Sequence, residues 1–109
     1  MTDRKKALTD LLEKVEAGGD VYGFGGLGTP LLRGYAESAC NGSLDSAKAL
    51  HEAVLPGWIL TYLGQYPYDW KAAVFKEPYG PRKEHTCAGN PARAWLIAIL
   101  KALIAKEDA

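Results

Sequence analysis

The segment from residue 90 to residue 107 constrains the fold most, because its pattern predicts a closing helix that is apolar on almost every side. Asn90 can accept a hydrogen bond from the first turn, and Pro91 supplies the backbone angle that suits a helix start. From residue 94 to residue 105 the only charged residue is Lys101. This apolar surface is too wide to rest on one neighbour, so we expect the helix to be covered from more than one side.

Three shorter helices are predicted before this one. Apolar residues recur at helical spacing in residues 3–17, Thr29-Pro30 opens a second helix through Cys40, and Ser43 caps a third that ends at Pro56-Gly57. The inward residues expected on the first helix are Leu8, Leu11, Leu12 and Val15. Those expected on the third are Leu44, Ala47, Leu50, Ala53 and Val54.

From Trp58 the apolar period changes to two, which predicts a strand. Strict alternation places Trp58, Leu60 and Tyr62 on one side and Ile59, Thr61 and Leu63 on the other. A second strand over residues 70–76 completes a hairpin, and a short third strand around Lys83 to Cys87 could pair at its edge. We therefore predict a single α+β domain over residues 1–109, with N-terminal helices, an antiparallel sheet of two or three strands, and the long C-terminal helix packed on that sheet.

Composition excludes several classes of protein. Thirteen basic residues balance thirteen acidic ones, which argues against a duplex nucleic-acid binder because such proteins need a basic surplus. No apolar run reaches the roughly 20 residues of a membrane span, and no signal-peptide core follows Met1, so we expect a cytoplasmic protein without a membrane partner. Cys40 and Cys87 are far apart in sequence and are expected to be reduced small apolar residues.

Residues 18–28 form a glycine-rich loop that contains Tyr22 and Phe24. The run Gly23 to Gly28 matches the G-x-G-x-x-G pattern of phosphate-binding loops, but no full strand precedes it and no parallel sheet is predicted. A flexible loop is the favoured interpretation. Its two aromatic residues would suit contact with a ligand or a partner.

Aromatic residues gather around the predicted hairpin: Trp58, Tyr62, Tyr66, Tyr68, Trp70, Phe75 and Tyr79. About half should belong to the core, as rings on a strand face usually do. Tyr66, Tyr68 and Tyr79 lie in or near turns, with Arg82 and Lys83 just beyond. Exposed tyrosines beside basic residues suit a protein interface or a stacking site for a base, although ordinary turn packing would also explain them.

Signs of catalysis are sparse. His51 and His85 have no neighbour at metal-ligand spacing, so we expect no metal and no cofactor. His85-Thr86-Cys87 could pair a base with a thiolate nucleophile, yet an orienting group and an oxyanion site are not evident, and an inert segment is favoured. We expect no catalytic residue and therefore no enzyme.

Two segments, Asn41 to Trp58 and Asn90 to Leu96, together resemble a group of small uncharacterised phage and prophage proteins from proteobacteria. That group is similar in layout to the phage ABA-sandwich domain proteins, in which a leading helix, an antiparallel hairpin or three-stranded sheet and a closing helix follow one another. The resemblance covers residues 41–107 and 7–18. It implies a fold but carries no catalytic motif to transfer, and this chain departs from it at residues 18–28 and 77–89.

The resemblance leads us to expect a non-enzymatic binding protein that counteracts host antiviral defence in the bacterial cytoplasm. It would block a host protein through the aromatic hairpin, or sequester a small signalling nucleotide with Arg82, Lys83 or Arg93 on the phosphate and a tyrosine on the base. The broad apolar terminal helix favours a homo-oligomer in either case. The alternatives are a structural or packaging accessory of the virion and a small enzyme that uses Cys87 and His85.

Overall fold

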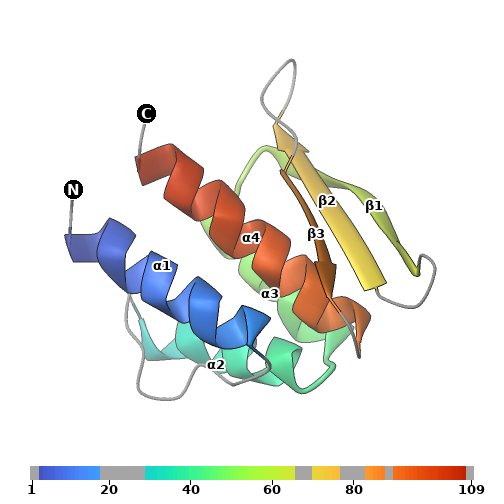
Figure 1. Cartoon of the computed structure of the whole chain (residues 1–109), viewed down its shortest axis with the longest axis horizontal. Coiled ribbons are helices and arrows are strands. Elements are labelled where there is room, and N and C mark those ends of the chain that lie inside the picture. The colour runs from blue at the N-terminus through green and yellow to red at the C-terminus, as the bar shows by residue number, and fades with distance from the viewer. Residues whose placement is uncertain (1–2, 18–28, 66–69, 77–82, 88–89, 108–109) are drawn as a thin grey trace.

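The computed structural model describes residues 3–17, 29–65, 70–76, 83–87 and 90–107 (Figure 1). In chain order its elements are α1 Asp3–Glu16, α2 Pro30–Cys40, α3 Leu44–Val54, β1 Trp58–Gln65, β2 Trp70–Lys76, β3 Lys83–Cys87 and α4 Pro91–Glu107. The strands form one antiparallel sheet in the order β1-β2-β3. The predicted α+β class, the hairpin and the third strand at Lys83–Cys87 are confirmed.

The predicted helix starts are also confirmed. Each capping side chain accepts a hydrogen bond from a backbone N–H of its first turn: Thr29 from Leu32 at 3.2 Å, Ser43 from Ser46 at 3.1 Å, and Asn90 from Arg93 at 2.6 Å. Gly42 and Gly57, which follow α2 and α3, have φ of 105° and 87°. This left-handed backbone favours glycine and explains why the chain turns at these two points.

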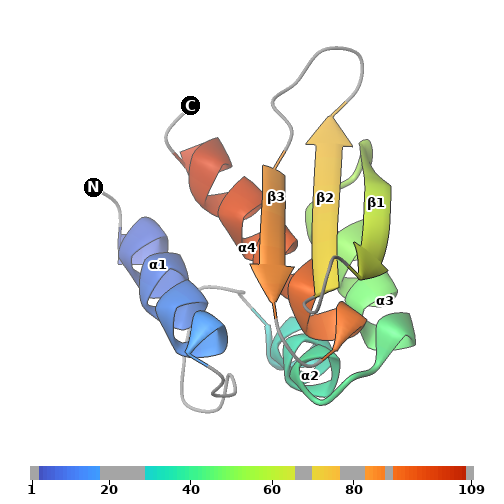
Figure 2. The same ribbon diagram turned by 45° about the vertical axis from the view of Figure 1, so that its right-hand side comes forward.

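α4 is the central element of the fold. It contacts α1, α2 and α3 as well as all three strands, and it lies across one face of the sheet (Figures 1 and 2). Every residue from Ala94 to Leu100 is buried. Because seven consecutive residues point in all directions around a helix, α4 is covered on every side within one chain. The expectation of cover from several sides is confirmed, but this helix leaves no broad apolar surface for a second copy.

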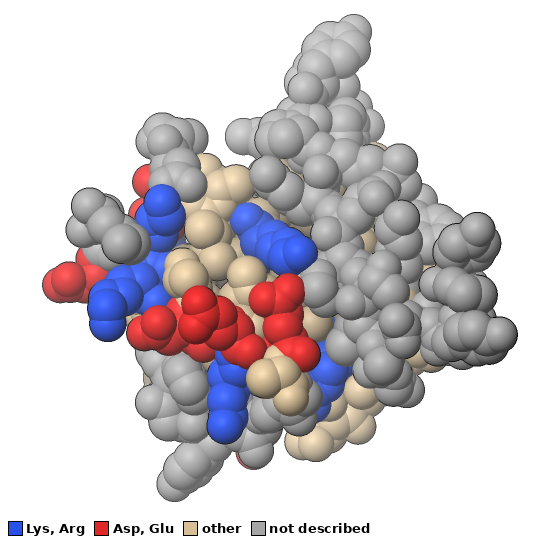
Figure 3. Space-filling view, viewed as in Figure 1, with Lys and Arg blue, Asp and Glu red and all other residues tan. Residues whose placement is uncertain are grey.

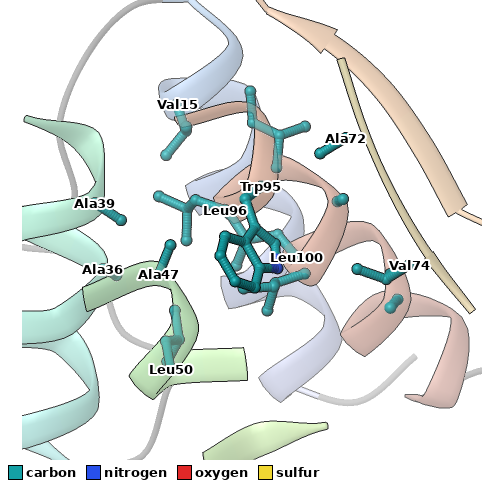
Figure 4. Close-up of a cluster of buried hydrophobic side chains, with 14 of the residues drawn as sticks. Val15, Ala36, Ala39, Ala47, Leu50, Ala72, Val74, Trp95, Leu96 and Leu100 are labelled. Carbon is teal, nitrogen blue, oxygen red and sulfur yellow. The ribbon is translucent and has the colours of Figure 1, made fainter. Parts of the chain in front are cut away.

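The core forms where all the layers meet at α4. Side chains of α1, α2, α3 and the sheet converge on Trp95, Leu96 and Leu100 (Figure 4). Three of the contributing residues of α2 and α3 are alanines, Ala36, Ala39 and Ala47, all with no exposed surface. Such small side chains permit close approach of helices.

The strict alternation expected for β1 is wrong beyond Leu60. The register of β1 on β2 shifts between Leu60 and Tyr62, so Thr61 is an extra residue in the strand. Leu60 and Leu63 consequently both pack against the core, on the side of Trp58. The bulge thus puts Leu63 on the face opposite to the one predicted.

The inward face of α3 also differs from the expectation. Ala47 and Leu50 are buried as predicted, and Val54 packs on the core, but Leu44 and Ala53 are exposed and His51 is buried instead. At 100° per residue the buried stripe is centred near Ala47 and Val54, which leaves Leu44 about 70° and Ala53 about 110° away from its middle. His51 falls inside this stripe.

Candidate functional site

No described helix lies over the second face of the sheet (Figure 2). β1 is an edge strand, and at its first residue, Trp58, it is bonded to Leu55 and to His51 of α3. Ala72 and Val74 of β2 belong to the core beneath α4, so the residues that alternate with them belong to the outer face. Of these, Ala73 has no exposed surface, and Ile59 of β1 lies opposite Phe75 in the register. The Ile59 side chain is 43% exposed, which is high for a large apolar residue in a strand. The surface that the sequence predicted, built on the tyrosines of the turns, lies outside the described residues and stays a prediction.

Most of the predicted binding residues lie outside the described residues. They are Tyr22, Phe24, Tyr66, Tyr68, Tyr79 and Arg82. Their roles remain predictions. Of the other aromatic residues, Trp58 is buried and Trp70 packs against the core, so these two are core residues as expected for half of the set.

Lys83 and Arg93, the two remaining candidates, are separated by the fold. Lys83 opens β3, opposite Val74, whereas Arg93 is in the first turn of α4, beyond the other end of β3. Strands rise about 3.3 Å per residue, so β3 alone accounts for about 13 Å between Lys83 and Cys87. The backbones of the two residues therefore lie near opposite ends of β3, and the role of Lys83 stays a prediction.

Arg93 joins the ends of three helices. Its guanidinium donates hydrogen bonds to the carbonyl oxygens of Val15 at 3.0 Å and Cys40 at 3.1 Å, near the C-terminal ends of α1 and α2. The side-chain amide of Asn90 donates to the same Cys40 carbonyl at 3.4 Å. Terminal carbonyls of a helix lack partners within the helix and carry partial negative charge, so a cation is well placed here. This arrangement gives Arg93 a structural role that sequence reasoning missed.

A second buried junction involves His51, which is 5% exposed. The indole Nε1 of Trp95 donates to His51 Nδ1 at 3.0 Å, and His51 Nε2 lies 2.9 Å from the carbonyl oxygen of Trp58. The two rings also meet edge to face, with centroids 5.7 Å apart. Since the indole N–H can only donate, Nδ1 must be the acceptor and Nε2 must carry the proton given to Trp58. His51 links α3, α4 and β1 as a neutral ring.

This junction leaves His51 without chemistry to offer. Both ring nitrogens are occupied by protein partners, so neither is available to a metal or a substrate proton. The sequence contained a signal for its burial, because His51 shares helical spacing with Ala47 and Val54. The partner Trp95 is 44 residues away and could not be inferred.

The other candidates for chemistry receive little support. In β3, His85 pairs with Ala72 and Cys87 with Trp70, but the side chains of His85 and Cys87 lie outside what the structure describes. The Cys40 side chain is buried in the core, consistent with its predicted apolar role. Within the described ranges, no group of three or more histidine, cysteine or acidic side chains could hold a metal ion.

Charges of the two signs are interleaved over α1 and the adjoining part of α4 (Figure 3). Arg4 is 3.0 Å from Glu107 and Lys101 is 3.8 Å from Glu16, both across the α1–α4 contact. On this face the described basic residues are therefore accompanied by acidic ones. None of the helices in the described part of the chain is both long and apolar enough to cross a lipid bilayer.

Comparisons of this chain with protein-family models, with curated proteins and with solved structures find no match.

Proposed function

We propose that this chain is a non-enzymatic binding protein, encoded by a phage or prophage, that counteracts host antiviral defence. The phage origin rests on the sequence resemblance to small uncharacterised phage and prophage proteins, and the defence target rests on analogy with phage accessory proteins of this size. Binding as the mode of action is supported by one observation above all: the outer face of the hairpin has no described helix over it and exposes Ile59 to 43%.

Blocking of a host protein is the mechanism that the described residues favour over sequestration of a nucleotide. The guanidinium of Arg93 is already bonded to two helix-terminal carbonyls, and Lys83 lies at the other end of β3. A phosphate site would therefore depend on Arg82 and on the tyrosines of the turns. The sequence is rich in tyrosine at the turns of the hairpin, and aromatic residues are enriched in interfaces with proteins.

The proposal includes self-association and a place of action in the cytoplasm of the infected cell. The reason for self-association is not the terminal helix, which α1, α2, α3 and the sheet already cover. A homo-oligomer must use another surface. The sheet offers one, since β1 is at an edge of the sheet.

Affinity capture from an infected host lysate, followed by mass spectrometry for proteins and nucleotides, tests this function. The baits are the wild-type chain, the double variant Tyr66→Ala with Tyr68→Ala, and Leu31→Ala as a control. Leu31 is an exposed apolar residue of α2, at 63%, outside the proposed surface. We expect wild type and Leu31→Ala to retain the same host protein and the double variant to lose it. Retention of a nucleotide alone would favour sequestration, and no enrichment with any bait would refute the binding function.

A further inference from the structure

The turn between α2 and α3 contains the sequence Asn41-Gly42, which places a side-chain amide next to an unhindered backbone nitrogen. The carbonyl carbon of an asparagine side chain can be attacked by the backbone nitrogen of the next residue, which closes a five-membered ring. Glycine in the next position favours this attack, because it has no side chain to obstruct it. Both residues are exposed. Among the described residues beyond its chain neighbours, none places a heavy atom within 4 Å of where a Cβ of residue 42 would lie.

We propose that Asn41 is a site of spontaneous deamidation and that the last turn of α2 controls its rate. In this reaction the Gly42 nitrogen bonds to the side-chain carbonyl carbon of Asn41, and the bond from that carbon to the amide nitrogen breaks. The amide nitrogen leaves as ammonia, with the proton that the Gly42 nitrogen gives up. Water then opens the ring at either of its carbonyls, which yields aspartate or isoaspartate. Water is the only co-reactant.

The folded turn holds both reacting groups in other hydrogen bonds. The backbone N–H of Gly42 donates to the Ala39 carbonyl oxygen at 3.0 Å, and the side-chain amide of Asn41 donates to the Glu37 carbonyl oxygen at 3.1 Å. The backbone of Asn41 has φ of −93° and ψ of 9°. Ring closure nearly eclipses its Cβ with the Gly42 nitrogen across the Cα–C bond, so ψ must rotate far from this value. The last turn of α2 must therefore open locally before the reaction can occur.

The reaction would alter a junction on which three helices depend. It adds one negative charge to a chain whose formal net charge is zero, at the C-terminal end of α2, where the helix dipole disfavours an anion. The preceding carbonyl, that of Cys40, is the one to which Arg93 donates. Isoaspartate also lengthens the main chain by one carbon just before Ser43, whose side chain caps α3. We therefore expect the converted protein to be less stable than the original.

Peptide mapping by mass spectrometry, after incubation of the full chain in mildly alkaline buffer, tests the site. One sample is unfolded in guanidinium chloride, and the other is folded with sodium chloride at the same concentration. Asn90 is an internal control, because the next residue is Pro91, which has no N–H to attack with. We expect Asn41 to convert in both samples, at least about tenfold more slowly in the folded chain, and Asn90 to stay unchanged. No conversion of Asn41 in the unfolded chain, or equal conversion of Asn90, would refute the site, and equal rates in both samples would refute control by α2.

Two glycine variants locate the opening that controls the rate. Ser38→Gly weakens the last turn of α2, and the matched control Lys48→Gly weakens the middle of α3, both at exposed positions. We expect Ser38→Gly to raise the rate in the folded chain at least about twofold and Lys48→Gly to have a smaller effect. Equal acceleration by both variants would overturn control by the last turn of α2.

The variant Asn41→Gln tests the consequence of the reaction, because it keeps the amide but would have to close a larger ring. After the same incubation, the urea midpoint of wild type should fall in proportion to conversion, while that of Asn41→Gln should not change. An unchanged midpoint for converted wild type would contradict the expected damage to the junction.

Discussion

Replacing His51 by phenylalanine should lower the free energy of unfolding by about 2 to 4 kcal/mol, because two buried polar groups lose their partners. Phenylalanine fills the space of the imidazole but can neither accept from Trp95 Nε1 nor donate to the Trp58 carbonyl, the contacts now at 3.0 and 2.9 Å. Each buried group left unsatisfied costs about 1 to 3 kcal/mol. For two groups this gives about 2 to 6 kcal/mol. We expect a value in the lower half of this range because Trp58 and Trp95 are not fully buried, with 7% and 8% of their surface exposed.

Two further variants separate hydrogen bonding from packing at this junction. His51→Gln retains one acceptor and one donor, so we expect it to recover about half of the loss. In a double-mutant cycle, Trp95→Phe should cost about 1 to 2 kcal/mol less when His51 is already phenylalanine than when it is present. The neighbouring Glu52→Ala, at an exposed position of α3, is the control and should change stability by less than about 0.5 kcal/mol.

Urea unfolding followed by circular dichroism measures these differences. With a slope of about 1.5 kcal/mol per M, a loss of 3 kcal/mol moves the midpoint by about 2 M. Nitrogen chemical shifts of His51 give an independent reading, since we expect the tautomer with the proton on Nε2. A stability loss below about 0.5 kcal/mol for His51→Phe, or no coupling with Trp95, would refute the reasoning.

Arg93→Ala should lower the free energy of unfolding by about 2 to 3 kcal/mol, because two helix-terminal carbonyls lose their partner, and Arg93→Lys should lower it by about half as much. In the same urea unfolding assay Arg33→Ala, at an exposed position, should be nearly neutral. Equal effects of the two alanine variants would contradict this role of Arg93. Ser43→Ala should cost about 1 kcal/mol through loss of the α3 cap, with Ser43→Gly smaller, and a neutral alanine variant would show that the cap does not matter. Cys87→Ser should leave capture of the host partner unchanged, and loss of function with an intact fold would instead support the enzyme hypothesis.

The elements that local chemistry determines were predictable from sequence. Thr29, Ser43 and Asn90 each have the side chain that a helix start requires, and each accepts the expected hydrogen bond. The apolar run of α4 required cover on several sides, and the fold provides it. Patterns with a period of a few residues are sufficient for such features, because the interactions are local.

The features that sequence did not predict depend on distant partners or on a break in period. In the sequence Arg93 was a candidate phosphate ligand. Its actual partners, two carbonyl oxygens, are 78 and 53 residues away and could not be inferred. Thr61 looks like any strand residue, and only pairing with β2 reveals it as the extra residue of a bulge. That one insertion put Leu63 on the core side, opposite to the face that strict alternation predicted. The position of β1 at an edge could not be predicted either, since it depends on the order of the strands in the sheet.

The central claim, that this chain holds a partner and does not transform it, is tested most directly by analysing the partner after binding. The captured molecule is incubated with the wild-type chain, released under denaturing conditions, and compared with the untreated molecule by intact mass and by molar ratio. We predict an unchanged mass and a fixed ratio of bound partner to chain. A partner with altered mass, or one consumed in large excess over the chain, would contradict the claim.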